Sequence, residues 1–164
     1  MRFLLSLCIA FFVSFSMCAA TSPSGTQATK QGASQSMLAE HFKVINGLFH
    51  YLNGVLSNPK QTIDKNNLTV FFAPKATWIL NDHVMATGIN QIATYLLHQR
   101  YRMDMSIHLP LQAVYLTRSQ WAVVKYQGEA KLKVGKALSL HAMVVVVFDS
   151  QGKIVKFDEV LAAL

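Results

Sequence analysis

The sequence predicts one α+β domain in which helices pack on one face of a curved antiparallel sheet. In the first half of the chain, apolar residues recur in steps of three and four, the spacing of an amphipathic helix. After Arg102 the period changes to two, the spacing of a β-strand. Short turns join the later strands, so we expect an antiparallel meander.

Residues 1–20, MRFLLSLCIAFFVSFSMCAA, have the pattern of a secretory signal peptide: a positive Arg2, an apolar run, and small residues before a cleavage site after Ala20. We therefore expect an exported protein, periplasmic or secreted, with no transmembrane span after cleavage. In a second interpretation, Cys18 is lipidated and anchors the chain to a membrane. Cys8 and Cys18 are the two cysteines of the chain, so cleavage after Ala20 removes every disulfide and thiolate candidate.

Residues 21–36, TSPSGTQATKQGASQS, are rich in Ser, Thr, Gly and Gln and lack large apolar side chains. Such a segment buries too little apolar surface to offset its ordering entropy, which predicts a flexible linker before a domain at 37–164. The formal net charge is +7, but the basic residues are scattered and no binding motif accompanies them. We expect a solvated basic surface and no nucleic-acid partner.

Three helices and one small hairpin are expected in the first half of the domain. The first helix carries an apolar stripe and is stopped by Pro59, and Pro74 separates a shorter second helix from the strand that follows. The expected order is a helix at 37–57, a helix at 60–72, strands at 76–80 and 84–86 around an Asn81-Asp82-His83 turn, and a helix from 88 to about 100.

The second half is expected to form long strands at 105–116, 121–133, 137–148 and 153–161. Pro110 falls inside the first of them and predicts a bulge there. The run MVVVVF at 143–148 is apolar on both faces, which predicts a central strand that is covered on both sides.

Four features together resemble the nuclear transport factor 2-like (NTF2-like) superfamily, which includes SnoaL-like and ketosteroid-isomerase-like domains. They are the long first helix, FFAPKATW at 71–78, the Gly88-Ile89-x-x-Ile92 start of the third helix, and GKIVKFDE at 152–159. The resemblance covers about Leu38 to Leu161. It implies a cone-shaped fold, with three N-terminal helices on a strongly curved antiparallel sheet and a pocket at the open end. Members of the superfamily include enzymes, transport adaptors, assembly domains and small-ligand binders.

The ketosteroid-isomerase residues of that superfamily are not matched here. Their chemistry needs a carboxylate base and two proton donors that stabilise an enolate oxygen. The resemblance places Leu80 at the base, Val144 near one donor and Leu52 at the other, so the isomerase mechanism is disfavoured. Tyr51 is adjacent to Leu52 but about 100° around the helix. Asp82 is better explained as a turn residue than as a base.

Glu159 is the strongest candidate for a polar group in the pocket, because the resemblance turns its face of the last strand inward. Desolvation would then raise its pKa; in the alternative, Glu159 lies at the rim and pairs with a lysine. Trp78 is expected to line the pocket, either to stack or hydrogen bond a ligand or as core packing alone. The expected pocket comprises Leu52, Trp78, Leu80, Val144, Val155, Phe157 and Glu159, and the weak catalytic candidates are Glu159, Asp82 and Tyr51.

No metal or cofactor is expected, because the six histidines have no paired arrangement and no GxSxG or Gly-rich phosphate motif occurs. An apolar pocket favours noncovalent binding of a small apolar or aromatic ligand, or of a protein partner. One alternative is a SnoaL-like enzyme (isomerase, cyclase or hydrolase) that uses Glu159. Another is a dimeric assembly component of an envelope complex, with a homodimer formed through the sheet face near Val114 and Leu116.

Overall fold

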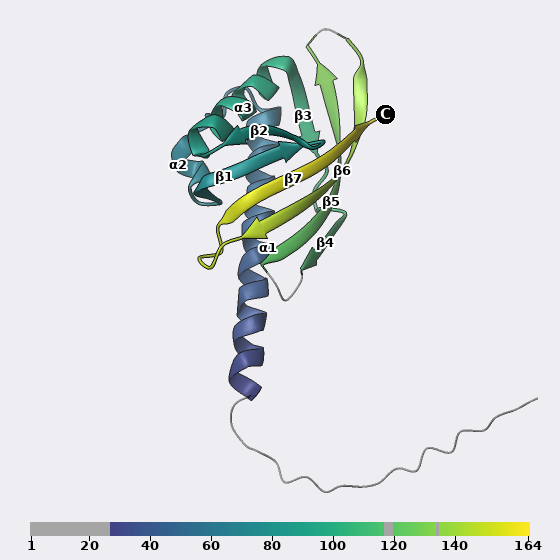
Figure 1. Ribbon diagram of the computed structural model, residues 1–164. Helices are drawn as coiled ribbons and strands as arrows, with labels where there is room; N and C mark the ends of the chain where they lie inside the picture. The colour runs from purple at the N-terminus through teal and green to yellow at the C-terminus, as the bar shows by residue number, and fades with distance from the viewer. Residues whose placement is uncertain (1–26, 117–119, 134) are drawn as a thin grey trace, which may run out of the picture.

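The computed structural model describes residues 27–116, 120–133 and 135–164 (Figure 1). The helices are α1 (Gln27–Ser57), α2 (Lys65–Leu68) and α3 (Ile89–Arg102). The strands are β1 (Phe72–Leu80), β2 (His83–Thr87), β3 (Met103–Ile107), β4 (Ala113–Leu116), β5 (Trp121–Leu132), β6 (Ala137–Phe148) and β7 (Ile154–Ala163). The predicted α+β class and the three helices are confirmed.

The strands form one curled sheet in the order β2-β1-β7-β6-β5-β3, with β4 also paired to β5. Figure 1 shows the sheet curving around α1, with α3 beside the β1–β2 hairpin. The pair β1 and β7 is parallel, whereas we expected an antiparallel sheet. The reason is that α3 carries the chain from the hairpin to the far edge, and the meander then returns to β1 with its last strand. Turn lengths predict only pairings between strands that follow each other in sequence.

Helix α1 begins at Gln27, earlier than the expected residue 37, so residues 27–36 of the expected linker are helical. Its N-terminal part extends beyond the sheet in Figure 1. Ala, Gln and Lys in this segment favour the helix, which is why a polar sequence can continue it. Residues 1–20, expected to be a signal peptide, and residues 21–26 lie outside the described residues. Among the described helices, none combines the length and apolar character needed to cross a bilayer.

The second helix is much shorter than the expected 60–72. Asp64 caps α2 by accepting a hydrogen bond from the Asn66 N–H at 2.9 Å. The chain joins the sheet soon afterwards, because the Phe71 carbonyl accepts a hydrogen bond from the Ile154 N–H at 2.9 Å. The apolar residues at 71 and 72, expected to end this helix, therefore lead into β1.

The single strand expected at 105–116, with a bulge at Pro110, is instead two separate strands, β3 and β4, which both pair with β5. Proline lacks a backbone N–H to donate, so the ladder stops there instead of continuing past a bulge. Strand β6 is central in the order, but only its inward face is fully covered. Val144 and Val146 on that face are buried, whereas Met143 on the other face is 44% exposed. The expectation that this strand is covered on both sides is therefore wrong, because the helices pack against one face of the sheet only.

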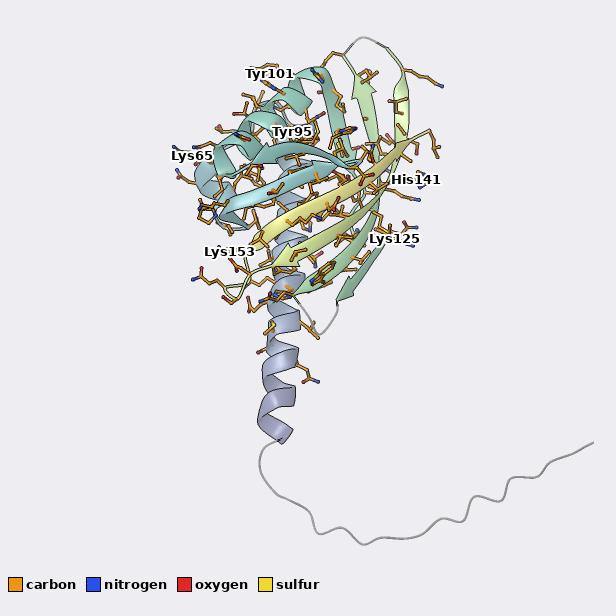
Figure 2. All side chains as sticks on the ribbon, viewed as in Figure 1. Lys65, Tyr95, Tyr101, Lys125, His141 and Lys153 are labelled. Atoms are coloured by element: carbon orange, nitrogen blue, oxygen red, sulfur yellow. The ribbon has the colours of Figure 1, made fainter. Side chains whose placement is uncertain are left out.

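The hydrophobic core lies between the concave face of the sheet and the helices. Helix α1 contributes a buried stripe, α3 contributes two buried residues, and β5 and β6 contribute alternate residues, as the period of two predicts. Among the fully buried side chains are Ile45, Leu48, Phe49, Ile92, Leu96, Phe148 and Phe157. Basic side chains stay on the surface and are dispersed: Lys65, Lys125 and Lys153 lie well apart in Figure 2.

Candidate functional site

A cavity of about 190 Å³ lies between the concave face of the sheet, α1 and α3. Most of its wall consists of aliphatic, methionine and aromatic side chains from these elements. Polar atoms come from few residues: Glu159, Tyr126, Tyr95, Gln99 and the indole of Trp78. The space is therefore an apolar chamber with a small polar cluster in its wall.

Glu159 is the carboxyl group of that cluster, and it is only 6% exposed. Strand β7 lies between β1 and β6, and Glu159 is the register partner of Leu80 on one side and of Val144 on the other. Its side chain points to the inward face of the sheet, as theirs do. The Glu159 carbonyl also accepts a hydrogen bond from the Asn81 N–H at 2.8 Å, which fixes the strand against the β1–β2 turn. Backbone hydrogen bonds alone therefore fix the position of residue 159 in the sheet.

The Tyr126 hydroxyl donates a hydrogen bond to Glu159 Oε1. Tyr126 belongs to β5, two strands away from β7, and the intervening β6 contributes the short side chains of Ala142 and Val144 to the same inward face. The phenol can therefore extend across β6 to reach the carboxyl. Tyr126 is 3% exposed and its ring lies edge-on to Phe49, with ring centroids 5.2 Å apart.

Burial raises the pKa of the Glu159 carboxyl above its ordinary value, because the charged form loses its hydration. Hydrogen bonding from Tyr126, and then the approach of the Trp78 indole, lower the pKa and partly offset that effect. The pKa of Tyr126 is raised well above its ordinary value by its own burial and by the nearby Glu159 charge. Both groups are thus biased toward their neutral, protonated forms.

Trp78 and Phe157 form the aromatic part of the wall. They are partners in the parallel β1–β7 pair, and their ring centroids are 4.3 Å apart. Trp78 is 4% exposed, and its Nε1–H has no hydrogen bond of regular geometry among the described residues, although it lies near enough to Glu159 to lower that pKa. This N–H is a donor that an occupant of the cavity could satisfy after a small shift.

Tyr95 of α3 closes the cavity from the helix side. Its ring centroid lies 5.7 Å from that of Trp78. Burial and the nearby Glu159 charge raise the pKa of Tyr95 to about 12, while a hydrogen bond with Gln99 acts in the opposite direction. Two phenols and one carboxyl therefore meet at one place in an otherwise apolar chamber.

Five of the seven residues expected in the pocket line this cavity: Leu52, Trp78, Leu80, Phe157 and Glu159. The alternative position for Glu159, at the rim with a lysine, is wrong, because the carboxyl is buried and bonded to Tyr126.

Val144 and Val155, the other two expected residues, do not line the cavity. Val144 faces inward but is completely covered by the core. A register shift near Val147 and Phe148 makes Ile154 the buried residue, and Val155 is displaced from the inward face. Counting back from Phe157 in steps of two predicts that Val155 points inward, because this count does not include the extra residue of the bulge.

The other two catalytic candidates lie away from the cavity. The Tyr51 ring packs against Phe71, with centroids 5.8 Å apart, and does not line the chamber. Asp82 is exposed and, together with Asn81, adopts a positive φ (65° and 47°) in a two-residue hairpin turn. Asp82 is therefore a turn residue, as expected. No cluster of three or more potential metal ligands occurs within the described residues.

Sequence reasoning missed Tyr126 and Tyr95. Tyr126 carried a usable signal, since it stands at an inward position of the alternating strand WAVVKYQGEAKL. Tyr95 lies between the apolar positions of α3, and its place beside Glu159 depends on how that helix crosses the sheet. The sequence pattern of α3 alone does not predict that Tyr95 lies beside Glu159.

Comparison with solved structures identifies the architecture. A SnoaL-like polyketide cyclase from Jannaschia sp. CCS1, named as putative, superimposes with a TM-score of 0.63 at 10% identity, covering 76% of this chain and 87% of that one. An NTF2-like protein from Burkholderia xenovorans LB400 gives a TM-score of 0.61 at 13% identity, covering 76% and 91%. The chain has the NTF2-like fold. An LEH-like epoxide hydrolase from M. tuberculosis shares this NTF2-like architecture, with a TM-score of 0.60, 10% identity and coverage of 76% and 84%. No protein-family model matches the sequence, and no curated protein sequence matches it.

Proposed function

We propose that this NTF2-like protein binds a small, mostly apolar molecule that presents one polar group to Glu159. The observation that carries the proposal is the Glu159 carboxyl, buried and bonded to Tyr126 in the wall of an apolar cavity. Convergent polar groups in a largely apolar chamber are the usual composition of a small-molecule site. The apolar wall supplies affinity, and the carboxyl and indole N–H supply orientation.

The volume of the cavity limits the size of the ligand. A dry protein cavity of about 150 Å³ accommodates benzene, and this cavity measures about 190 Å³. One ring, or a short branched chain of similar size, therefore fits without rearrangement. The aromatic face made by Trp78 and Phe157 favours a flat group.

Calorimetric titration with 4-methylphenol, together with native mass spectrometry of protein from its own source, tests this proposal. Trp78→Ala should abolish retention of a co-purified molecule, and Glu159→Gln should weaken phenol binding by about two- to tenfold, the worth of one hydrogen bond. Asp158→Asn is the matched control, because Asp158 immediately precedes Glu159 in β7 but pairs with Lys156 on the other face, at 2.7 Å. Binding that none of these variants alters would show that the ligand is held elsewhere.

A second candidate is acid–base catalysis on the bound molecule. Glu159 has a raised pKa and lies beside two phenols, and perturbed groups of this kind are typical of catalytic sites. Structures with the same fold include an epoxide hydrolase and a cyclase named as putative. In this proposal the protonated Glu159 donates its proton to the substrate, and Tyr126 stabilises the carboxylate that results.

The catalytic proposal is tested with epoxide hydrolysis and cyclisation substrates. Glu159→Gln should remove turnover while substrate binding remains. Tyr126→Phe should shift the alkaline limb of the pH profile upward, because the Tyr126 hydrogen bond lowers the pKa of the Glu159 acid. Turnover that survives in Glu159→Gln contradicts this assignment.

Export, to the periplasm or to the medium, is proposed on the N-terminal sequence pattern and is tested by cell fractionation and N-terminal sequencing.

Assembly through the sheet face is favoured by Met143 and Val160, which are partners on the outer face and are 44% and 54% exposed. Val114, one of the expected contact residues, is half-buried, and the side chain of Leu116 lies outside the described part. Met143→Lys should make a homodimer monomeric in sedimentation experiments, and an unchanged dimer would refute this surface.

A further inference from the structure

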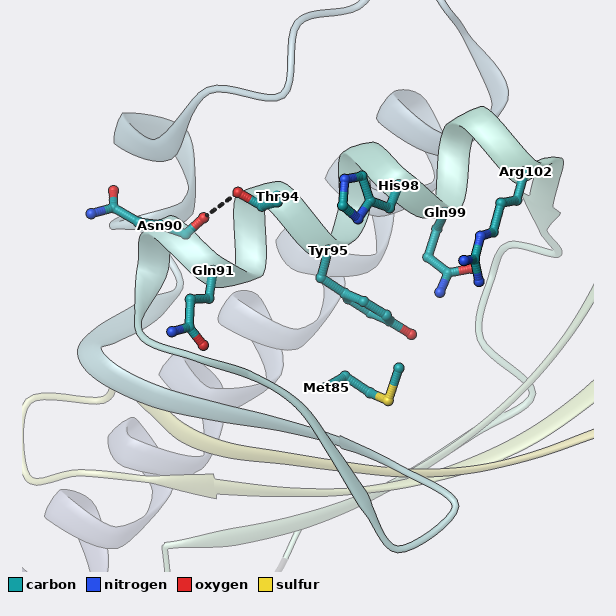
Figure 3. A pocket seen from close by; sticks show the side chains of 8 residues that line it. All are labelled: Met85, Asn90, Gln91, Thr94, Tyr95, His98, Gln99 and Arg102. Atoms are coloured by element: carbon teal, nitrogen blue, oxygen red, sulfur yellow. Dashed lines mark hydrogen bonds between the residues drawn. The ribbon is translucent and has the colours of Figure 1, made fainter.

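A second hollow, of about 480 Å³, lies along the exposed side of α3 (Figure 3). We call it the α3 groove. Met85 of β2 faces the helix across it, and its other lining residues come from α3, between Asn90 and Arg102. In contrast to the cavity, these α3 side chains are polar or charged apart from the tyrosine ring. The protein therefore has an apolar chamber and a polar groove on the two sides of one helix.

Tyr95 and Gln99, one helical turn apart, line both the groove and the cavity. In Figure 3 the Tyr95 ring extends from the helix toward Met85, and Gln99 lies beside it toward the C-terminal end of α3. Both side chains are half-buried. Where these two residues lie, the α3 groove and the cavity are separated by side chains, which change rotamer readily. A rotamer change of Gln99 would allow one molecule to occupy both spaces.

The charges of the two spaces differ. Arg102 and His98 line the α3 groove, and none of the described acidic residues lines it. The cavity, in contrast, has the carboxyl of Glu159 in its wall. Within the described ranges Arg102 forms no ion pair, and the neighbouring Asp104 is paired with Lys133. Arg100, on the same helix, instead donates a hydrogen bond to the Gln61 carbonyl. The Arg102 guanidinium is thus an exposed cation in the α3 groove, near Gln99, and a carboxylate is the group that guanidinium binds most favourably.

We propose that the ligand is an amphipathic carboxylate whose ring-sized apolar part occupies the cavity and whose carboxylate lies in the α3 groove against Arg102. The inference rests on the proposed binding function and specifies its ligand class. The orientation follows from desolvation: an anion in the cavity would lose its hydration and meet Glu159 instead of a cation. In the groove the carboxylate keeps part of its hydration and gains the guanidinium.

Matched probes test the ligand class. Phenylacetate, 3-phenylpropanoate and 4-phenylbutanoate differ in the distance from ring to carboxylate, and the amide of each acid keeps the same shape without the charge. We expect one acid to bind more tightly than its amide by about two- to fivefold in calorimetry, as one exposed ion pair allows. Added salt should reduce this preference, because the groove is open to solvent.

Arg102→Gln should abolish the preference for the acid and leave amide affinity unchanged. Arg100→Gln removes the same charge two residues earlier, outside the groove, and should preserve the preference; its thermal midpoint verifies that it folds. Equal affinity for acid and amide, or a preference that survives Arg102→Gln, overturns the proposal. If 4-methylphenol binds but no acid of the series does, the ligand class is wrong and the binding function stands. If neither 4-methylphenol nor any probe binds, both are wrong.

Discussion

Replacing Tyr126 with Phe removes the hydroxyl that donates to Glu159 and keeps the ring that packs on Phe49. Both partners are nearly inaccessible to bulk solvent, 3% and 6% exposed, and only a water inside the cavity could take the place of the lost donor. Leaving a buried acceptor without its donor costs about 1–3 kcal/mol of unfolding free energy. We therefore expect Tyr126→Phe to be clearly destabilised at neutral pH.

Urea denaturation of the wild type, Tyr126→Phe, Glu159→Gln and the double variant measures the coupling between the two side chains. In direct contact they should show a coupling free energy of about 0.5–3 kcal/mol. Tyr101→Phe is the matched control, because Tyr101 is 71% exposed and should change stability by no more than about 0.5 kcal/mol.

Two results would refute this reasoning. One is a Tyr126→Phe variant as stable as Tyr101→Phe, and the other is a double variant in which the two single effects simply add. Either would mean that the hydroxyl and the carboxyl do not depend on each other for their burial.

Three further predictions concern pH and backbone conformation. The raised pKa of Glu159 means that the native state binds more protons than the unfolded state, so the wild type should lose stability relative to Glu159→Gln as the pH rises above 4.5; a pH-independent difference in urea midpoint would contradict this. Burial lowers the pKa of His41, so the opposite sign applies: stability should fall as the pH drops below 6.5, and His41→Phe should reduce that fall in thermal melts. Gly88 has a φ of 81°, and an added Cβ would lie 3.2 Å from the Pro74 carbonyl oxygen, so Gly88→Ala should cost more than about 1 kcal/mol in chemical denaturation. Gly152→Ala, at a φ of 75° with open space around it, should cost less; equal costs would mean that the close approach to Pro74 is unimportant.

The sequence predicted the inward face of β7 at Phe157 and Glu159 because a strand alternates with a period of two. The same rule failed at Val155, since a bulge adds one residue and the rule cannot register the insertion. Asp82 was recognised as a turn residue from its chemistry, which is local. Local patterns therefore recovered the face of each strand except where the spacing itself changes.

The polar cluster could not be predicted, because its members meet through long-range pairings. Leu80 lies opposite Glu159 only because β1 and β7 pair in parallel, and the Asn81 side chain fastens that junction by bonding both backbone groups of Leu161, 80 residues away, at 3.2 and 2.9 Å. Tyr126 reaches the same carboxyl from two strands away. Periodicity gives the side on which a residue lies, but the partner across the sheet follows from strand order.

The position of β7 also determines when the molecule can fold. The strand between β1 and β6 is the last of the described strands in sequence order, so the β1–β2 hairpin has no partner on its inner edge until β7 has been synthesised. Contacts separated this far in sequence must overcome a large loop-closure entropy and tend to form late. A nascent chain in which β7 is still missing would present two unpaired sheet edges, on β1 and on β6, which are exposed to association with other chains.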